Sequence, residues 1–258
     1  MGYQAISYEI RNGVAYVTLN RPELMNALNA QMRREITQAF QDAQENARAV
    51  VMTGAGVSFC SGQDLADASA QGKLDMEATL RDEYVPMLKA IFDCKVPTIC
   101  AVNGPAAGAG ANLALAADVV IASEDAYFVQ AFTRIGLIPD AGGTYWLPRQ
   151  IGAARAMGAA LFADKISATQ ARDWGMIYET APAETFEAHV QSRAEHLAHG
   201  PTVAYAQLKT AMRGSLENTL DEQLAVEAKL QAICGETYDF KEGVAAFLEK
   251  RAPRYEGR

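Results

Sequence analysis

The sequence predicts an α/β fold in which a sheet is buried by helices and a helical section follows at the C-terminal end. Two observations predict it. First, short apolar runs alternate with helical patterns, and each run ends in a glycine-rich turn. Second, strand patterns nearly disappear after about Ser167, while helical periodicity continues almost to the end of the chain.

The N-terminal segment has the pattern of a β-hairpin followed by a helix. Residues 6–11 and 14–20 alternate in polarity around Asn12-Gly13, a dipeptide that favours tight hairpin turns. Apolar residues then recur at steps of three and four from Met32 to Ala43. This spacing predicts an amphipathic helix.

The middle of the chain is expected to supply the buried strands. Apolar runs at 49–53, 97–102 and 119–123 predict three of them, and 126–129 is expected to extend the same sheet. Residues 79–92 have the pattern of a helix. The first two apolar runs open into segments of small residues, which let backbone N–H groups approach a ligand.

The C-terminal part consists of separate amphipathic patterns, at 184–197, 202–212, 220–233 and 240–250. Such helices have little to pack on alone, so they usually dock on the core or on a neighbouring subunit. We therefore expect a core over residues 1–200 and a helical region over residues 201–258.

Composition narrows the class of protein. A formal net charge of −8 argues against nucleic acid as the main partner. The four cysteines form no CxxC pair and the three histidines lie far from the first three of them, so no metal site is expected. The first residues lack a secretory pattern, and the apolar stretch 99–122 carries polar residues that make it a poor membrane span. We expect a cytoplasmic protein without structural disulfides.

Two glycine-rich turns, 58–65 and 103–112, are the first candidates for a functional site. Two such turns facing each other could direct two backbone N–H groups at one oxygen, which is the geometry of an oxyanion hole. On spacing alone, close-packing turns without a ligand explain the pattern better. Nucleotide motifs are weak or missing, because Leu113 fills the third glycine position of GxGxxG and there is no GKS, GKT or GxSxG.

Asp140 lies in a third candidate segment, between Ile138-Pro139 and Ala141-Gly142-Gly143. Burial among such apolar neighbours would raise its pKa, which suits a proton shuttle. The alternative is a helix N-cap, for which Asp is a favoured residue. The sequence physics leaves these two alternatives equal.

Together these segments resemble the crotonase (enoyl-CoA hydratase/isomerase) superfamily, in order and over nearly the whole chain. The matching strings are NRP (20–22) with NAL (26–28), GAG (54–56), FCSGQDL (59–65), AVNG (101–104), LALAAD (113–118), GLIPDAGG (136–143) and KEGVAAFLEKR (241–251). The resemblance implies a spiral of ββα units, a helical trimerisation region after residue 200, and a homotrimer or a dimer of trimers. It also implies an acyl-CoA thioester as ligand, with no cofactor beyond the coenzyme A of the substrate.

The resemblance also assigns the site residues. It places the oxyanion-hole N–H groups on Gln63 and Ala109, where many family members have glycine at the second position. Further contacts to the substrate are expected from Cys60, Ser61, Gly62, Asp64, Leu65, Gly108, Phe128 and Phe132. Phe247 and Lys250 are expected to reach the coenzyme A of a neighbouring subunit.

Two departures from the family pattern point to the reaction. Family hydratases use two glutamates, and this chain has Asn112 and Phe132 at those positions. Neither side chain can activate water as a base, so Asp140 is the acid that remains at a recognised catalytic position. One carboxylate above an enolate is enough to move a proton from one carbon to another, so isomerisation is expected rather than hydration.

Among subfamilies, the strings 106–111, 136–143 and 172–178 look most like 1,2-epoxyphenylacetyl-CoA isomerases, which convert a ring epoxide to an oxepin in phenylacetate breakdown. Phe128 and Phe132 would give an aromatic-lined pocket, or they are ordinary core aromatics. The alternatives are an enoyl-CoA hydratase, an enzyme like 4-chlorobenzoyl-CoA dehalogenase, an RNA-binding homologue and a subunit without catalysis. The dehalogenases use a histidine ahead of the second turn, which this chain lacks. The helix 29–46 carries only two arginines, too few cations for RNA.

Overall fold

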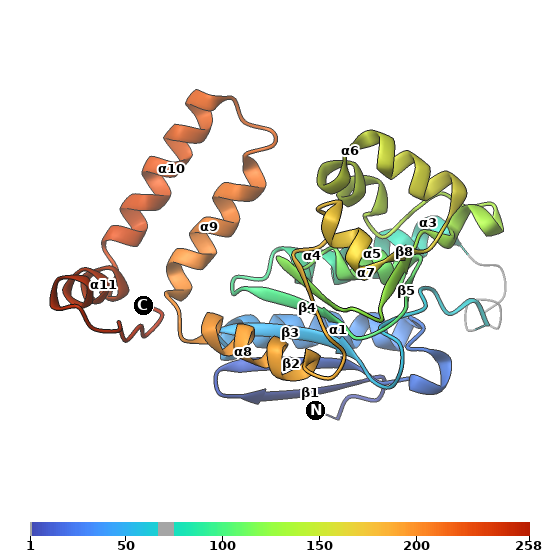
Figure 1. Cartoon of the computed structure of the whole chain (residues 1–258), viewed down its shortest axis with the longest axis horizontal. Coiled ribbons are helices and arrows are strands. Elements are labelled where there is room, and N and C mark those ends of the chain that lie inside the picture. Colours follow the sequence, from blue (N-terminus) through green and yellow to red (C-terminus); the bar gives the residue numbers. More distant parts are fainter. Residues whose placement is uncertain (1, 67–74) are drawn as a thin grey trace.

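The computed structural model describes residues 2–66 and 75–258, and it confirms the α/β core with a helical C-terminal region (Figure 1). The core is built on a six-stranded sheet with the strand order β1-β2-β3-β4-β6-β9. Its strands are β1 (Ile6–Arg11), β2 (Val14–Leu19), β3 (Ala49–Gly54), β4 (Thr98–Val102), β6 (Val119–Ser123) and β9 (Glu179–Ala181). The β1–β2 hairpin is antiparallel and all other neighbours are parallel.

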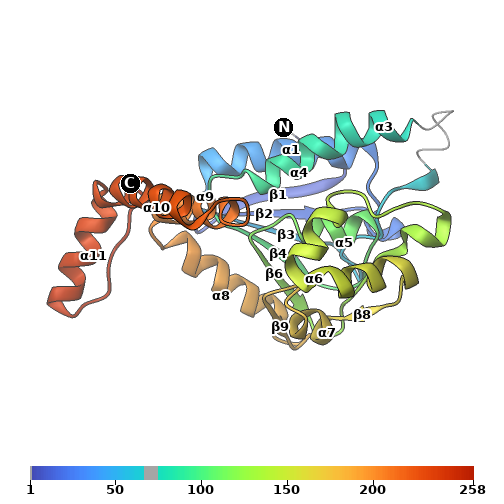
Figure 2. The same cartoon turned by 90° about the horizontal axis from the view of Figure 1, so that it is seen from above.

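Helices cover both faces of the main sheet, as Figure 2 shows. One face packs against α1 (Ala30–Asn46), α4 (Val85–Phe92) and α5 (Ala109–Ala114), and the other against α8 (Phe186–Ala198). The strands β3, β4 and β6 carry apolar side chains on both sides because both faces are buried.

The segment expected as one helix over 79–92 consists of three joined pieces. They are α3 (Met76–Thr79), a π-helical stretch η2 (Leu80–Tyr84) and α4. The 3-10 segments η1 (Pro22–Leu24) and η3 (Ala131–Ile135) and the helices α6 (Gly143–Phe162) and α7 (Ala168–Asp173) complete the core. Non-helical backbone at Gly152 interrupts α6.

One strand prediction is wrong, and one short strand was not predicted. Residues 126–129 do not extend the main sheet: β7 (Tyr127–Val129) lies in a second sheet, between β5 (Ala106–Ala107) and β8 (Ile166–Ser167). The neighbour position beside β6 is filled by β9, which follows Ser167. A three-residue strand carries too little periodicity to be found in a sequence.

The helices α9 (Thr202–Gly214), α10 (Leu220–Gly235) and α11 (Tyr238–Glu249) extend away from the core (Figure 1). They have no buried residue except on α11, and their exposed apolar side chains include Leu208, Met212, Leu224 and Phe247. A groove of about 940 Å³ lies among the three helices. An exposed apolar surface of this kind is typical of a subunit interface.

We predict that α9–α11 form the contact of a homotrimer or a dimer of trimers. Leu224→Asp should weaken assembly, because it buries a charge in that contact, whereas Lys229→Gln on an exposed position of α10 should not. Light scattering of the two variants and the parent gives the masses. A parent chain that is a stable, active monomer contradicts the prediction.

Candidate active site

The two glycine-rich turns meet in the structure and pack directly against each other. A Cβ at Gly62, whose φ is +96°, would lie 2.8 Å from the carbonyl oxygen of Ala107. A Cβ at Gly110 would lie 2.4 Å from the carbonyl oxygen of Cys60. The amide of Ala107 donates to that same oxygen over 2.9 Å. The approach requires glycine on both sides, since any larger residue would force the turns apart.

The contact brings the amides of Gln63 and Ala109 to neighbouring places. Ala109 opens α5, and its nitrogen would lie 3.3 Å from a Cβ at Gly62, the residue before Gln63. Within the described residues, neither amide donates a hydrogen bond to another group of the chain. Two free N–H groups from facing turns are what an oxyanion hole needs, so Gln63 and Ala109 stay the candidates for that role.

The side chain of Gln63 is anchored, which fixes the direction of its backbone. Its Oε1 accepts from the hydroxyl of Tyr84 over 2.5 Å and from Nη1 of Arg33 over 2.9 Å. Arg33 is held in turn by Glu83, 2.6 Å away, and its guanidinium faces the Tyr84 ring. Sequence reasoning missed Arg33 and Tyr84, because their link to Gln63 exists only after η2 packs against α1.

A cavity of about 320 Å³ adjoins these two amides, and its wall is mostly apolar. It is lined by Ser61, Gly62, Gln63, Leu65, Met76, Thr79, Leu80, Tyr84, Gly108, Ala109, Ala131, Phe132, Arg134, Ile135, Leu137 and Asp140. Among the described residues of this wall, Asp140 is the only one with an acidic side chain. The site therefore combines two N–H donors, a small apolar space and one carboxylate.

The carboxylate of Asp140 is a poorly solvated acid. Burial raises the pKa of Asp140 from its usual value to about 6. Its Oδ1 is buried without a hydrogen-bond partner among the described residues. An acid with this pKa can both take and return a proton near neutral pH.

The N-cap alternative for Asp140 is wrong. The N-cap of α6 is Gly142, in the left-handed region, and no side chain caps this helix. Asp140 contributes its carbonyl oxygen instead, which accepts from the amide of Gly143 over 2.8 Å. The carboxylate is thus left facing the cavity rather than satisfying the helix end.

Asn112 holds the loop that carries Asp140. Its Nδ2 donates to the carbonyl oxygen of Asp140 over 2.7 Å, and its Oδ1 accepts from Nε2 of Gln130 over 2.9 Å. Both amide side chains are almost completely buried, with 0% and 1% of their surface exposed. A Cβ at Gly143 would lie 2.3 Å from Nδ2 of Asn112, so the loop packs tightly on this amide. The sequence drew attention to Asn112 only as a missing glutamate, and it gave no sign of Gln130.

The structure places the predicted contact residues in two groups. Ser61, Gly62, Leu65, Gly108 and Phe132 line the cavity with the two amides and Asp140. Phe132 lies in the wall, with its ring 3.8 Å from where a Cβ of Gly108 would be.

The second group does not reach the cavity in this chain: Cys60, Asp64, Phe128, Phe247 and Lys250. Cys60 donates from Sγ to the carbonyl oxygen of Asn26, and burial raises its pKa to about 12. Asp64 forms an ion pair with Arg21 at 2.9 Å, and Phe128 is a fully buried core residue. Phe247, 82% exposed, and Lys250 lie on or at the end of α11, so a contact to a neighbouring subunit stays a prediction.

No group of three or more His, Cys, Asp or Glu side chains in residues 2–66 and 75–258 could hold a metal ion. Among the described helices, none is both long and apolar enough to cross a bilayer.

Comparison with known proteins places this geometry in a family. A family model described as enoyl-CoA hydratase/isomerase matches residues 9–258. A "Probable enoyl-CoA hydratase" of Rhodobacter capsulatus is 59% identical over all of both chains. The "1,2-epoxyphenylacetyl-CoA isomerase" of Escherichia coli is 43% identical over 96% of this chain and 97% of that protein. The crystal structure of an enoyl-CoA hydratase from Polaromonas has a TM-score of 0.93 and 33% identity, covering 98% of this chain and 100% of the other.

We predict that Asp140→Asn makes the fold more stable at pH 7. The raised pKa means that the folded state binds the Asp140 proton more tightly than the unfolded state, so stability falls as pH rises from about 4 to about 6. After discounting for the solvated part of the group, the gain should be about 1–2 kcal/mol. Urea unfolding at pH 7 and pH 4 measures it, and the gain should shrink at pH 4. A loss of stability at pH 7 would show that the carboxylate stabilises the loop.

Proposed function

Because this chain belongs to the enoyl-CoA hydratase/isomerase family of enzymes that act on acyl-CoA thioesters, we propose that it is an isomerase with Asp140 as its proton shuttle. Its α/β fold with C-terminal helices is the crotonase fold expected from the sequence, shared with enoyl-CoA hydratase structures. The observation that carries the proposal is that Asp140 is the single carboxylate in the described cavity wall.

Hydration needs both a base and an acid on one face of the double bond in order to add a water molecule. The two positions at which family hydratases carry glutamates are filled by Asn112 and Phe132. The side-chain amide of Asn112 is hydrogen-bonded to the Asp140 loop, and the Phe132 ring forms part of the cavity wall. Neither residue leaves a group that could activate water.

Isomerisation fits the groups that are present. The thioester oxygen would lie between the amides of Gln63 and Ala109, where the negative charge of an enolate is stabilised as it develops. The carboxylate of Asp140 would remove a proton from one carbon of the acyl chain and return it to another. With a pKa of about 6, the group is largely ionised at pH 7 and still able to accept a proton.

For the acyl group we propose the ring epoxide of phenylacetyl-CoA, with its conversion to the oxepin, and in addition double-bond shifts in enoyl-CoA. The mostly apolar cavity with the Phe132 ring in its wall suits an aromatic acyl group. The isomerase of Escherichia coli, 43% identical, is named for this substrate.

A second candidate function is enoyl-CoA hydration. It is favoured by the name of the Rhodobacter capsulatus protein, which at 59% identity is more similar to this chain than the isomerase is. The two candidates differ in what they require of the site, because hydration needs a second acid–base group and isomerisation does not.

We predict that Asp140→Asn lowers isomerisation of a 3-enoyl-CoA by about 100- to 10,000-fold, the usual contribution of one general base. Affinity for the CoA ester should change little, because the two amides that hold the thioester remain. Turnover and ligand binding are measured side by side, with Asp164→Asn, an exposed aspartate outside the cavity, as the matched control.

The parent enzyme should hydrate crotonyl-CoA at a negligible rate beside its isomerisation rate. Hydration at a comparable rate would favour the second candidate function. Near-normal isomerisation by Asp140→Asn would exclude the proposed role of this carboxylate.

A further inference from the structure

The loop that carries Asp140 also packs against a residue outside the cavity wall, Trp146. Gly142 is in the left-handed region, and a Cβ there would lie 2.2 Å from Nε1 of Trp146. The indole of Trp146 therefore lies directly against the loop, two residues after Asp140. Its N–H is buried and has no hydrogen-bond partner in the part of the chain that the structure describes, so the contact is one of packing.

Trp146 is packed on a second aromatic ring, that of Phe92 at the end of α4. The ring centroids are 5.2 Å apart and the planes are tilted by 40°. Tyr145 meets the indole edge-on at 4.8 Å. Aromatic pairs at these separations attract each other beyond the burial of their area, so the indole has a defined position.

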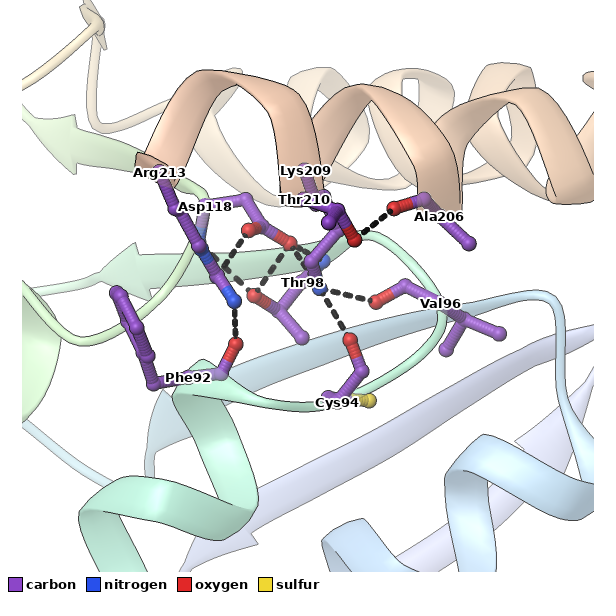
Figure 3. Close-up of polar contacts among 9 residues, drawn as sticks. All are labelled: Phe92, Cys94, Val96, Thr98, Asp118, Ala206, Lys209, Thr210 and Arg213. Atoms are coloured by element: carbon purple, nitrogen blue, oxygen red, sulfur yellow. Dashed lines mark hydrogen bonds and ion pairs between the residues drawn. The ribbon is translucent and has the colours of Figure 1, made fainter. Parts of the chain in front are cut away.

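The third member of this stack comes from the C-terminal region. The guanidinium of Arg213, on α9, lies 3.8 Å from the centroid of the Phe92 ring and donates to the carbonyl oxygen of Phe92. Figure 3 shows Arg213 reaching down from α9 to Phe92 and Asp118. Arg213 is thus the point at which the C-terminal helices touch the aromatic pair.

The position of Arg213 is itself fixed by a group of polar contacts. Asp118 accepts from Nη2 of Arg213 at 2.6 Å and pairs with Nζ of Lys209 at 2.7 Å. Lys209 also donates to the carbonyl oxygens of Cys94 and Val96, and burial lowers its pKa (Figure 3). The C-terminal part of α9 is therefore anchored to the core next to Phe92.

We infer that Trp146 is a positioning residue for the Asp140 loop, held in place by Arg213 of the C-terminal region through the ring of Phe92. The contacts form one continuous stack, from the guanidinium of Arg213 through Phe92 and Trp146 to Gly142. A loop kept within the reach of a proton transfer needs such support, because a displacement of about 1 Å can cost about 100-fold in rate. This inference rests on the proposed role of Asp140.

The stack gives the helical region a second role. Whatever fixes the direction of α9, including contact with a neighbouring subunit, would also fix Arg213 over Phe92. Assembly and the geometry of the Asp140 loop are then linked by packed side chains rather than by a distant effect.

Substitutions at Trp146 test the positioning role. Trp146→Ala should lower kcat about 10- to 100-fold with little change in KM. Trp146→Phe keeps an aromatic ring in place without the N–H, and it should restore most of the rate. Removing the indole admits water beside Asp140, so the limb of the kcat–pH profile near pH 6 should move to lower pH. An equal loss in both variants would show that the N–H rather than the ring is used and would overturn the inference.

The link to α9 is tested at Arg213. Arg213→Lys keeps a cation for Asp118 but loses the planar group that lies over Phe92. It should lower kcat while the melting temperature stays near that of the parent. The double variant of Arg213→Lys with Trp146→Ala should lose no more activity than Trp146→Ala alone, since the two residues act through one stack.

Tryptophan emission, which does not depend on catalysis, tests this inference separately from the proposed function. The chain has two tryptophans, so Trp174→Phe leaves Trp146 as the single one. In that background Arg213→Lys should shift the emission of Trp146 and increase its quenching by acrylamide. An unchanged emission and an unchanged kcat would overturn the inference, even if Asp140 proves essential. If Asp140 proves dispensable for catalysis, a changed emission of Trp146 would still show that Arg213 acts on the indole through Phe92.

Discussion

The hydrogen bond from the buried side chain of Asn112 to the carbonyl oxygen of Asp140 is the contact on which the site depends. It joins α5, whose first amide belongs to the candidate oxyanion hole, to the loop that carries the carboxylate. Because Gln130 fixes the other end of the Asn112 amide, the donor cannot rotate away. One side chain thus holds the N–H group of Ala109 and the acid in a fixed relation.

That relation explains the electrostatics of the site. With its backbone committed to Asn112 and Gly143, the carboxylate of Asp140 faces an apolar cavity, and burial raises its pKa to about 6. The surrounding fold keeps this acid desolvated despite the energetic cost. Glycine at 62, 110 and 143 allows backbone and side chains to approach closer than any other residue would. The resemblance to family hydratases implies a glutamate at the position of Asn112, where this chain has an amide that holds the Asp140 loop.

Much of this could be predicted from the sequence, because it depends on local patterns. Periodicity predicted the hairpin, the buried strands and the four C-terminal helices, and the apolar neighbours of Asp140 predicted its raised pKa. The contacts that hold the site residues in place could not be predicted. Gln130 and Trp146 act through contacts with residues 18 and 54 positions away, and such pairings are decided only by tertiary packing. For the same reason Cys60 and Phe128, close in sequence to the cavity, are turned into the core.

In the proposed reaction, one carboxylate moves a proton between two carbons on one face of an enolate. A 3-enoyl-CoA deuterated at the carbon next to the thioester tests it most directly, because the label can be followed to the far carbon by NMR and mass spectrometry. We expect part of the deuterium to be transferred within each molecule and delivered to the same face, as a single shuttle at Asp140 requires. Delivery to the opposite face, or complete exchange with solvent in every turnover, would exclude a single carboxylate as the shuttle.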